Sequence, residues 1–445
     1  MSFLKRRPSN GSSPVTESER QSVLASDVFT PAMPAWRGFV GRGREIKDLT
    51  FKGLRVPGMQ IVVWGESGAG KSSLINKALL AEGRAAVSTS CTPESAFEGI
   101  LSDALVSTGA FYVSERGEDS DGSFSASIQG GGEIIGAKGK LKERLAQRAS
   151  VKKQLIAPPD MTVRTLFYAL GQYNLSWVIE DYHKMSTKER GRLAHALKVF
   201  SDHGGAYRHT QVIILGVAES VDELVGGSAN LANRVMDVQV PPLSKSELGE
   251  ILDLGGKILN VDFSVVRARL IEMSVGTASI THALALGCCD EREVTYECPS
   301  LTCLSNRDLS AATASYVRTH SGRLKPRFDN ALTVYRKRKY ENPVLIIRAL
   351  AELPEEGGSV GEILEIIRRD HPEYPSSNAT NYLDRLQRDE CGGLVRMTSL
   401  KKYRFDEPMQ HAYAKMLFGL SLSEGTEEGL DSGVTWGAAL ARLQS

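Results

Sequence analysis

The residues with the clearest chemical potential form one short run, Gly65-Glu66-Ser67-Gly68-Ala69-Gly70-Lys71-Ser72, which Ser73 continues. The run matches the pattern GxxxxGK[ST] and lies between an apolar segment (59–65) and an amphipathic one (72–83). Glycines let backbone N–H groups turn inward around a phosphate, and the start of a helix adds partial positive charge. In such a loop Lys71 reaches the β- and γ-phosphates, and the Ser72 hydroxyl binds Mg²⁺. The run therefore predicts a site for ATP and Mg²⁺ rather than a glycine-rich turn without a ligand.

A phosphate site of this kind needs an acid to hold the metal. Glu180 and Asp181 follow the apolar residues of segment 175–181. The first acid would bind the Mg²⁺ side and the second would activate the attacking water, so we assign both to metal binding and catalysis. The usual order is Asp followed by Glu, and the shorter Asp181 predicts slow turnover. The alternative is an acidic helix cap.

Further apolar segments supply the sheet that must position these groups. Runs without polar alternation, spaced by helices, are typical of a parallel sheet covered on both faces; here they cover 59–65, 85–90, 175–181 and 211–218. We therefore expect an α/β core over 29–245, with an insertion at about 109–156. A basic helix within it, 138–153, is either a solvated helix or a surface that faces nucleic acid.

The second half of the chain changes character. Residues 246–340 are predicted to be helical, and 341–415 read as three short helices followed by a two-stranded hairpin, the pattern of a winged helix. We expect residues 1–28 to form a flexible tail and 416–445 a polar one.

The composition excludes several classes of protein. The 445 residues include 54 Lys and Arg against 53 Asp and Glu, so the formal net charge is +1. This near-neutrality excludes a histone-like coat for DNA, because any contact with nucleic acid must come from a local patch. The chain has no apolar run long enough for a membrane span and no secretory signal at its amino end, so a cytoplasmic location is expected.

A resemblance supports this layout. Phe39-Val40-Gly41-Arg42, the strand at 211–220 and Asn233-Arg234 with the following VMDVQVPPLSKSEL resemble segments of AAA+/STAND-type P-loop ATPases. The layout is similar to the origin-recognition initiators and to bacterial defence-associated ATPases. The resemblance implies that Val40, Gly41 and Arg42 close over the adenine. It also implies a sensor-1 polar residue, at Ser220 or Glu219, and an arginine finger, Arg234, that acts on the neighbouring subunit of a homo-oligomer. The alternative for Arg234 is a surface salt bridge.

The chain departs from these families in the lid. The segment GTASITHALAL (276–286) contains no sensor-2 arginine, and the proline of the STAND pattern is missing. Gly276 and His282 remain, so nucleotide sensing by the lid would involve His282. The alternative is that His282 is a packed residue of the core.

The predicted winged helix has two alternative partners. Asn378, Thr380 and Asn381 have side chains that could read base edges of double-stranded DNA, and Lys401, Lys402 and Arg404 could hold its phosphates. Docking of a protein is the alternative.

Two functions are consistent with these patterns. The first is an ATPase switch whose nucleotide-dependent self-assembly acts on DNA or on an effector protein encoded nearby, as in antiphage defence, replication or transposition. The second is a low-turnover, nucleotide-bound adaptor that docks a protein partner through the winged helix.

Overall fold

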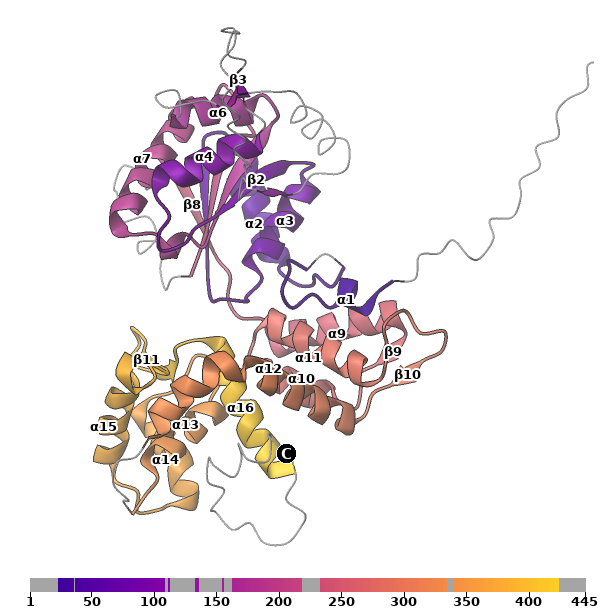
Figure 1. Ribbon diagram of the computed structural model, residues 1–445, viewed down its shortest axis with the longest axis vertical. Coiled ribbons are helices and arrows are strands. Elements are labelled where there is room, and N and C mark those ends of the chain that lie inside the picture. Colours follow the sequence, from indigo (N-terminus) through magenta and orange to yellow (C-terminus); the bar gives the residue numbers. More distant parts are fainter. Residues whose placement is uncertain are drawn as a thin grey trace, which may run out of the picture.

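The computed structural model describes residues 23–35, 37–108, 111–112, 133–135, 154–155, 162–217, 233–333 and 339–423. These residues form three parts: the sheet-containing core, a helical lid (245–333) and a C-terminal unit (339–423). In Figure 1 the core lies at one end of the molecule, and the lid and the C-terminal unit lie next to each other at the other end.

The core is built on a parallel sheet. Five parallel strands lie in the order β2-β6-β7-β1-β8, and the short β4 (Glu133–Ile135) is antiparallel to β2 at the edge. The parallel strands are β1 (Gln60–Trp64), β2 (Ala85–Ser90), β6 (Leu175–Glu180), β7 (Val212–Gly216) and β8 (Val235–Gln239). The α/β fold class predicted from the apolar runs is confirmed.

Helices cover both faces of this sheet. One face packs against α2 (Gly43–Asp48), a π-helical turn at Leu49–Leu54 and α3 (Lys71–Ala81); the other packs against α4 (Phe97–Ser107), α6 (Val163–Gly171) and α7 (Thr187–His203). Alternate residues of β1 point to opposite faces, so Ile61 and Val63 join one apolar cluster and Val62 the other. The core therefore has its own hydrophobic interior on each side.

The predicted insertion is described only in part. β3 (Phe111–Tyr112) pairs with β5 (Gln154–Leu155), and β4 extends the main sheet. The basic helix predicted at 138–153 lies outside the described residues.

The lid consists of α9 (Lys245–Leu259), α10 (Arg267–Met273), α11 (Ala278–Glu291) and the long α12 (Asn306–Leu332), with a small parallel pair of β9 (Val261–Asp262) and β10 (Thr302–Cys303). Its first helix is capped by Ser244 and Glu247, which satisfy each other's backbone N–H groups. Residues 23–35, here called the N-terminal strap, pack on the lid through α1 (Ala25–Val28) and Phe29. Residues 23–28 thus belong to the folded structure, whereas the sequence analysis assigned them to a tail.

The C-terminal unit contains the three helices and the hairpin expected from the sequence. They are α13 (Asn342–Glu352), α14 (Val360–Asp370), α15 (Ser376–Leu386) and the strands β11 (Val395–Met397) and β12 (Tyr403–Phe405). A final helix, α16 (Pro408–Ser423), continues beyond residue 415, and its Met416 and Leu417 are buried. The expected polar tail therefore cannot begin at 416.

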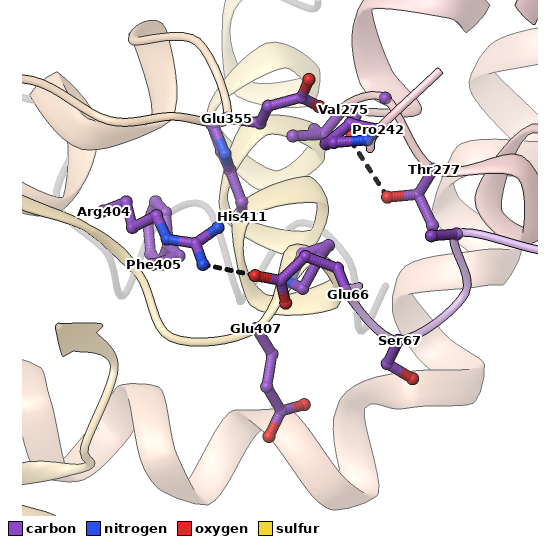
Figure 2. Close-up of a pocket in the computed structure, with 13 residues that line it drawn as sticks. Glu66, Ser67, Pro242, Val275, Thr277, Glu355, Arg404, Phe405, Glu407 and His411 are labelled. Carbon is purple, nitrogen blue, oxygen red and sulfur yellow. Dashed lines mark hydrogen bonds and ion pairs between the residues drawn. The ribbon is translucent and has the colours of Figure 1, made fainter. Parts of the chain in front are cut away.

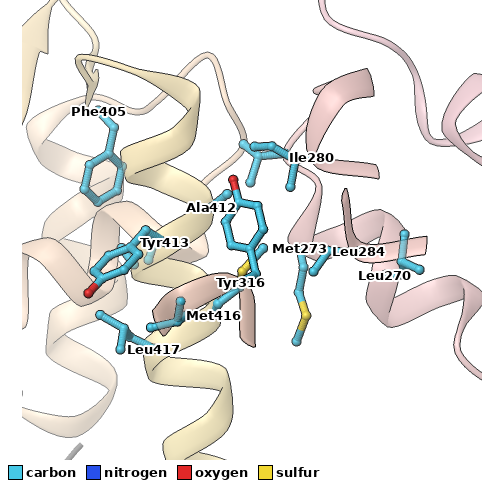
Figure 3. Close-up of a cluster of buried hydrophobic side chains, with 14 of the residues drawn as sticks. Leu270, Met273, Ile280, Leu284, Tyr316, Phe405, Ala412, Tyr413, Met416 and Leu417 are labelled. Carbon is cyan, nitrogen blue, oxygen red and sulfur yellow. The ribbon is translucent and has the colours of Figure 1, made fainter. Parts of the chain in front are cut away.

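A single apolar cluster joins the lid to the C-terminal unit. Figure 3 shows Tyr413, Met416 and Leu417 of α16 in the same cluster as Met273 and Leu284 of the lid. Neither part therefore has a separate hydrophobic interior. Among the described residues, no helix combines the length and apolar character that crossing a membrane requires.

Candidate nucleotide site

The phosphate loop runs from the end of β1 to the start of α3. Gly65, Gly68 and Gly70 have φ values of 152°, 76° and 91°, a region that disfavours residues with a Cβ atom. A Cβ at Gly65 would lie 2.4 Å from the carbonyl oxygen of Val240, whereas one at Gly70 would meet no atom within 4 Å. The loop conformation thus depends on glycine, and open space adjoins Gly70.

Lys71 lies across this loop. Its Nζ donates hydrogen bonds to the carbonyl oxygens of Gly65, at 3.0 Å, and Glu66, at 2.8 Å. Burial lowers the pKa of Lys71 to about 8, although the nearby carboxylates of Asp181, Glu66 and Glu180 oppose this shift. A buried ammonium group that donates to two carbonyl oxygens is well suited to an incoming phosphate.

Glu180 is the last residue of β6, and its side chain contacts Ser72, the residue after Lys71. Its Oε2 accepts a hydrogen bond from Ser72 Oγ at 2.9 Å, and its Oε1 accepts one from Ser88 Oγ at 2.9 Å. Ser88 lies on the neighbouring β2 and is not part of any motif in the sequence that predicts a metal site. A hydroxyl and a carboxylate are the oxygen donors that Mg²⁺ prefers, so Ser72 and Glu180 fit this ion.

Asp181 occupies a different position from its neighbour. It follows β6 with a φ of 56°, and its carboxylate pairs with Lys184 at 2.7 Å. The side chain is 48% exposed. The second acid of the predicted pair therefore lies beside the site but is held by a surface lysine.

A second part of the site is an open cavity of about 310 Å³ beside the loop. Three segments line it: the chain before the loop, the phosphate loop and the lid, through Ala35, Gly38, Phe39, Val40, Arg42, Ala69, Gly70, Ser73, Leu243, Ile251, Ala278 and His282. Its walls are mostly apolar, as the binding of a flat base requires.

The segment 40–42, which is predicted to close over the adenine, packs close to the lid. Arg42 is buried and donates hydrogen bonds to the carbonyl oxygens of Ala69 and Pro241. A Cβ at Gly41 would lie 2.7 Å from Oε1 of Glu247 in α9. Arg42 therefore joins the phosphate loop to the segment between β8 and α9, and Val40 forms part of the cavity wall.

His282 and Ser73 also hold the wall in place. The His282 Nδ1 accepts a hydrogen bond from the Thr30 N–H at 3.3 Å, and burial lowers the pKa of His282 to about 4. A neutral imidazole does not balance phosphate charge, so the position fits a packed residue that also lines this cavity. The Ser73 Oγ accepts a hydrogen bond from the Ala35 N–H at 2.9 Å.

Arg234 lies far from its own phosphate loop. It precedes β8, whose register places Val235 beside Gln60 at the start of β1, whereas the loop follows the end of β1. Its guanidinium pairs with Asp202 at 2.8 Å. Arg234 is therefore outside the site of its own chain, and Ser220 lies outside the described residues.

A further cavity of about 370 Å³ lies where the phosphate loop, the lid and the C-terminal unit meet. Figure 2 shows Arg404 of the hairpin directed at the carboxylate of Glu66, and Arg396 pairs with the same oxygen at 2.6 Å. The guanidinium of Arg404, a residue predicted to hold DNA phosphates, contacts the phosphate loop in this structure. Another predicted DNA contact, Asn378, donates a hydrogen bond to Asn342 at 3.0 Å.

No protein-family model matches the chain, and no curated protein matches it in sequence. Solved structures do show similarity. A Walker-type ATPase from Pyrococcus abyssi shares 14% identity at a TM-score of 0.45, over 85% of this chain and 96% of that one. The Aeropyrum pernix ORC2 protein shares 11% at 0.44, over 90% and 98%. Cdc6p from Pyrobaculum aerophilum shares 14% at 0.41, over 90% and 99%. Because the TM-scores are below 0.5, the assignment of a function depends on the geometry of this chain alone.

Proposed function

We propose that the chain is an ATP-binding, Mg²⁺-dependent ATPase that acts as a molecular switch. The contact between Ser72 Oγ and Glu180 Oε2 at 2.9 Å carries this proposal. It brings Ser72, the residue after the loop lysine, to the acid at the end of β6, which is separated from β1 in the sheet by β7. This pairing suits a metal at the terminal phosphates of a nucleotide.

In this mechanism the loop N–H groups and Lys71 hold the phosphates, and the cavity lined by Val40 and His282 holds the base. Ser72 and Glu180 would hold Mg²⁺, which supplies positive charge to the β- and γ-phosphates when bound. Asp181 accepts a proton from the attacking water after its carboxylate leaves Lys184. The need to break this ion pair is consistent with slow turnover.

The first experiment compares binding with hydrolysis. Lys71→Ala should weaken the binding of ATP and ADP by about 100-fold, because the buried ammonium group is lost. Glu180→Gln should keep ATP binding but reduce phosphate release by about 100-fold. Lys198→Ala, an exposed lysine on α7, is the matched control and should change neither quantity.

The proposal fails if Lys71→Ala binds ATP at the affinity of the unsubstituted protein. If Glu180→Gln releases phosphate at the unsubstituted rate, the ATPase assignment fails while nucleotide binding stands.

We also propose that the nucleotide changes the position of the C-terminal unit, and that this change leads to self-assembly or to contact with a partner. The polar contacts of Glu66 with the hairpin support this proposal, since they end at the phosphate loop. Arg404 and Asn378 already have intramolecular partners, which favours coupling within the chain over direct reading of DNA by α15.

Light scattering with ATP, with ADP and with duplex DNA separates these alternatives. ATP alone should increase the molecular mass of the particles. An increase that requires DNA would contradict self-assembly driven by the nucleotide.

A further inference from the structure

The hairpin of the C-terminal unit carries two arginines at directly opposed positions. Arg396 in β11 and Arg404 in β12 are register partners in the antiparallel pair. Like charges at such positions destabilise a hairpin unless an anion lies between them. The anion here is Glu66, a residue of the phosphate loop, and the Nη2 groups of both arginines donate to its Oε1.

These three side chains are largely shielded from water. The exposed fractions are 27% for Arg396, 15% for Arg404 and 20% for Glu66. Charge-assisted hydrogen bonds are stronger in such surroundings than at an open surface. Two guanidinium groups therefore converge on one carboxylate oxygen and form an anion site. Other acids lie nearby: Glu355 and Glu407 line the adjoining cavity, and Asp406 is close to Arg396.

Glu66 connects this anion site to the predicted phosphate position. Its carbonyl oxygen accepts the hydrogen bond from Lys71 Nζ at 2.8 Å, while its side chain contacts the two arginines. The hairpin arginines are thus one glutamate side chain away from the lysine expected to bind the terminal phosphates. Arg404 and Ser67 line the same cavity.

We propose that Arg396 and Arg404 bind the terminal phosphate of a nucleoside triphosphate, and that Glu66 occupies their site when this phosphate is absent. The inference rests on the proposed ATP site and specifies which residues distinguish ATP from ADP. A phosphate, like a carboxylate, accepts hydrogen bonds from a guanidinium fork, and it carries more charge. ATP therefore displaces Glu66 and draws the hairpin onto the nucleotide, whereas ADP leaves the pair on Glu66.

The test measures the dissociation constants of ADP and of a non-hydrolysable ATP analogue by calorimetry. In the double variant Arg396→Gln/Arg404→Gln, the analogue should bind about tenfold more weakly, since charge-assisted hydrogen bonds to the third phosphate are lost. ADP should bind as before. Arg369→Gln, which removes a surface cation of the same unit that pairs with Glu352, is the matched control and should leave both constants unchanged.

Glu66→Gln provides the opposite test without removing the arginines. It weakens the competing occupant, so the affinity for the analogue should rise about tenfold relative to the affinity for ADP. The loss of a negative charge near Lys71 acts on both nucleotides, and the ratio of the two dissociation constants removes this shared effect. This variant keeps the inference testable if the double variant does not fold.

Three outcomes overturn the inference. In the first, ADP and the analogue gain affinity equally in both variants. The contact of Glu66 with the two arginines would then only restrict access to the phosphate loop. Both nucleotides could lose affinity equally in the double variant, or neither nucleotide could respond in either variant. If the unsubstituted protein binds neither ADP nor the analogue, the proposed function itself fails, and that result is distinct from a loss of discrimination between them.

Discussion

The C-terminal unit meets the rest of the molecule through two junctions of opposite character. Its junction with the lid is a continuous apolar cluster that includes Phe328, Phe405 and Tyr413. Its junction with the core includes the ion pairs of Glu66 with the hairpin arginines. Apolar burial persists whatever the ligand, whereas an ion pair can exchange one anion for another. In the proposed switch, the lid and the C-terminal unit are therefore expected to stay joined while the core junction opens.

The largest effect should come from the apolar junction. Phe328 is fully buried, and its ring centroid lies 5.2 Å from that of Tyr413 and 6.4 Å from that of Phe405. Phe328→Ala should lower the free energy of unfolding by about 3–5 kcal/mol, because it leaves a cavity. Denaturant unfolding measures this loss, and the exposed Phe51→Ala should cost about 0.5 kcal/mol or less. Separate unfolding transitions for the lid and the C-terminal unit in the unsubstituted protein would contradict the single apolar body.

A smaller effect is expected where the lid and the C-terminal unit meet near the loop. Gly276 has a φ of 65°, and an added Cβ would lie 1.8 Å from Oε2 of Glu355. Gly276→Ala should therefore destabilise the protein by about 2 kcal/mol. In Gly361→Ala the added Cβ would lie 3.7 Å from its nearest neighbour, Ser359 Oγ. Replacing glycine by alanine in a helix raises the free energy of unfolding by about 0.5–1 kcal/mol. Thermal unfolding of the two variants should shift in opposite directions, and equal shifts would refute the steric argument.

Nucleotide affinity at the phosphate loop should depend on pH through the ionisation of Lys71. Burial lowers its pKa to about 8, and phosphate binding requires the ammonium form. Nucleotide affinity should therefore be constant below pH 8 and fall by up to about tenfold per pH unit above it. Calorimetry above pH 8 should also show proton uptake on binding. An affinity that stays constant up to pH 9.5 would show that another group balances the phosphate charge.

The smallest effect concerns Glu355. Burial, followed by the neighbouring charges of Glu356 and Glu66, raises its pKa to about 7, while Lys415 opposes the shift. The folded state then binds a proton that the unfolded state releases between about pH 4.5 and 7, so the free energy of unfolding falls as the pH rises through this range. Glu355→Gln should remove this dependence and stabilise the protein by about 1 kcal/mol above pH 7, since solvent screens a partly exposed group. A gain of equal size at pH 4 would contradict the assignment.

The phosphate-binding part of the site can be predicted from the sequence because its motifs are short and contiguous. The run from Gly65 to Ser72 is contiguous, and Glu180 ends an apolar strand. The ion pair between Glu66 and Arg404 cannot be predicted from the sequence, because the two residues are 338 positions apart and no periodic pattern links them. The hairpin was predicted, but its partner depends on how the C-terminal unit packs on the lid.

Local patterns do not reveal which polar side chains have a partner within the chain. Asn378 lies on the helix predicted to read base edges, yet it bonds to Asn342, which also accepts a hydrogen bond from the Tyr374 hydroxyl. The predicted tail from 416 fails for a related reason. Met416 and Leu417 are apolar residues that continue α16 into the cluster shared with the lid, and only that tertiary surface explains their burial.

The N-terminal strap has a consequence for the order in which the chain folds. The Thr30 N–H reaches His282 across a separation of 252 residues, and Val28 and Phe29 are fully buried in the lid cluster. During synthesis the strap leaves the ribosome before the core and the lid, and its partner follows about 10–50 s later, after the intervening core is made. A fragment that ends at residue 245 keeps the strap but lacks the lid surface that buries Val28 and Phe29. A soluble core fragment should therefore begin after the strap.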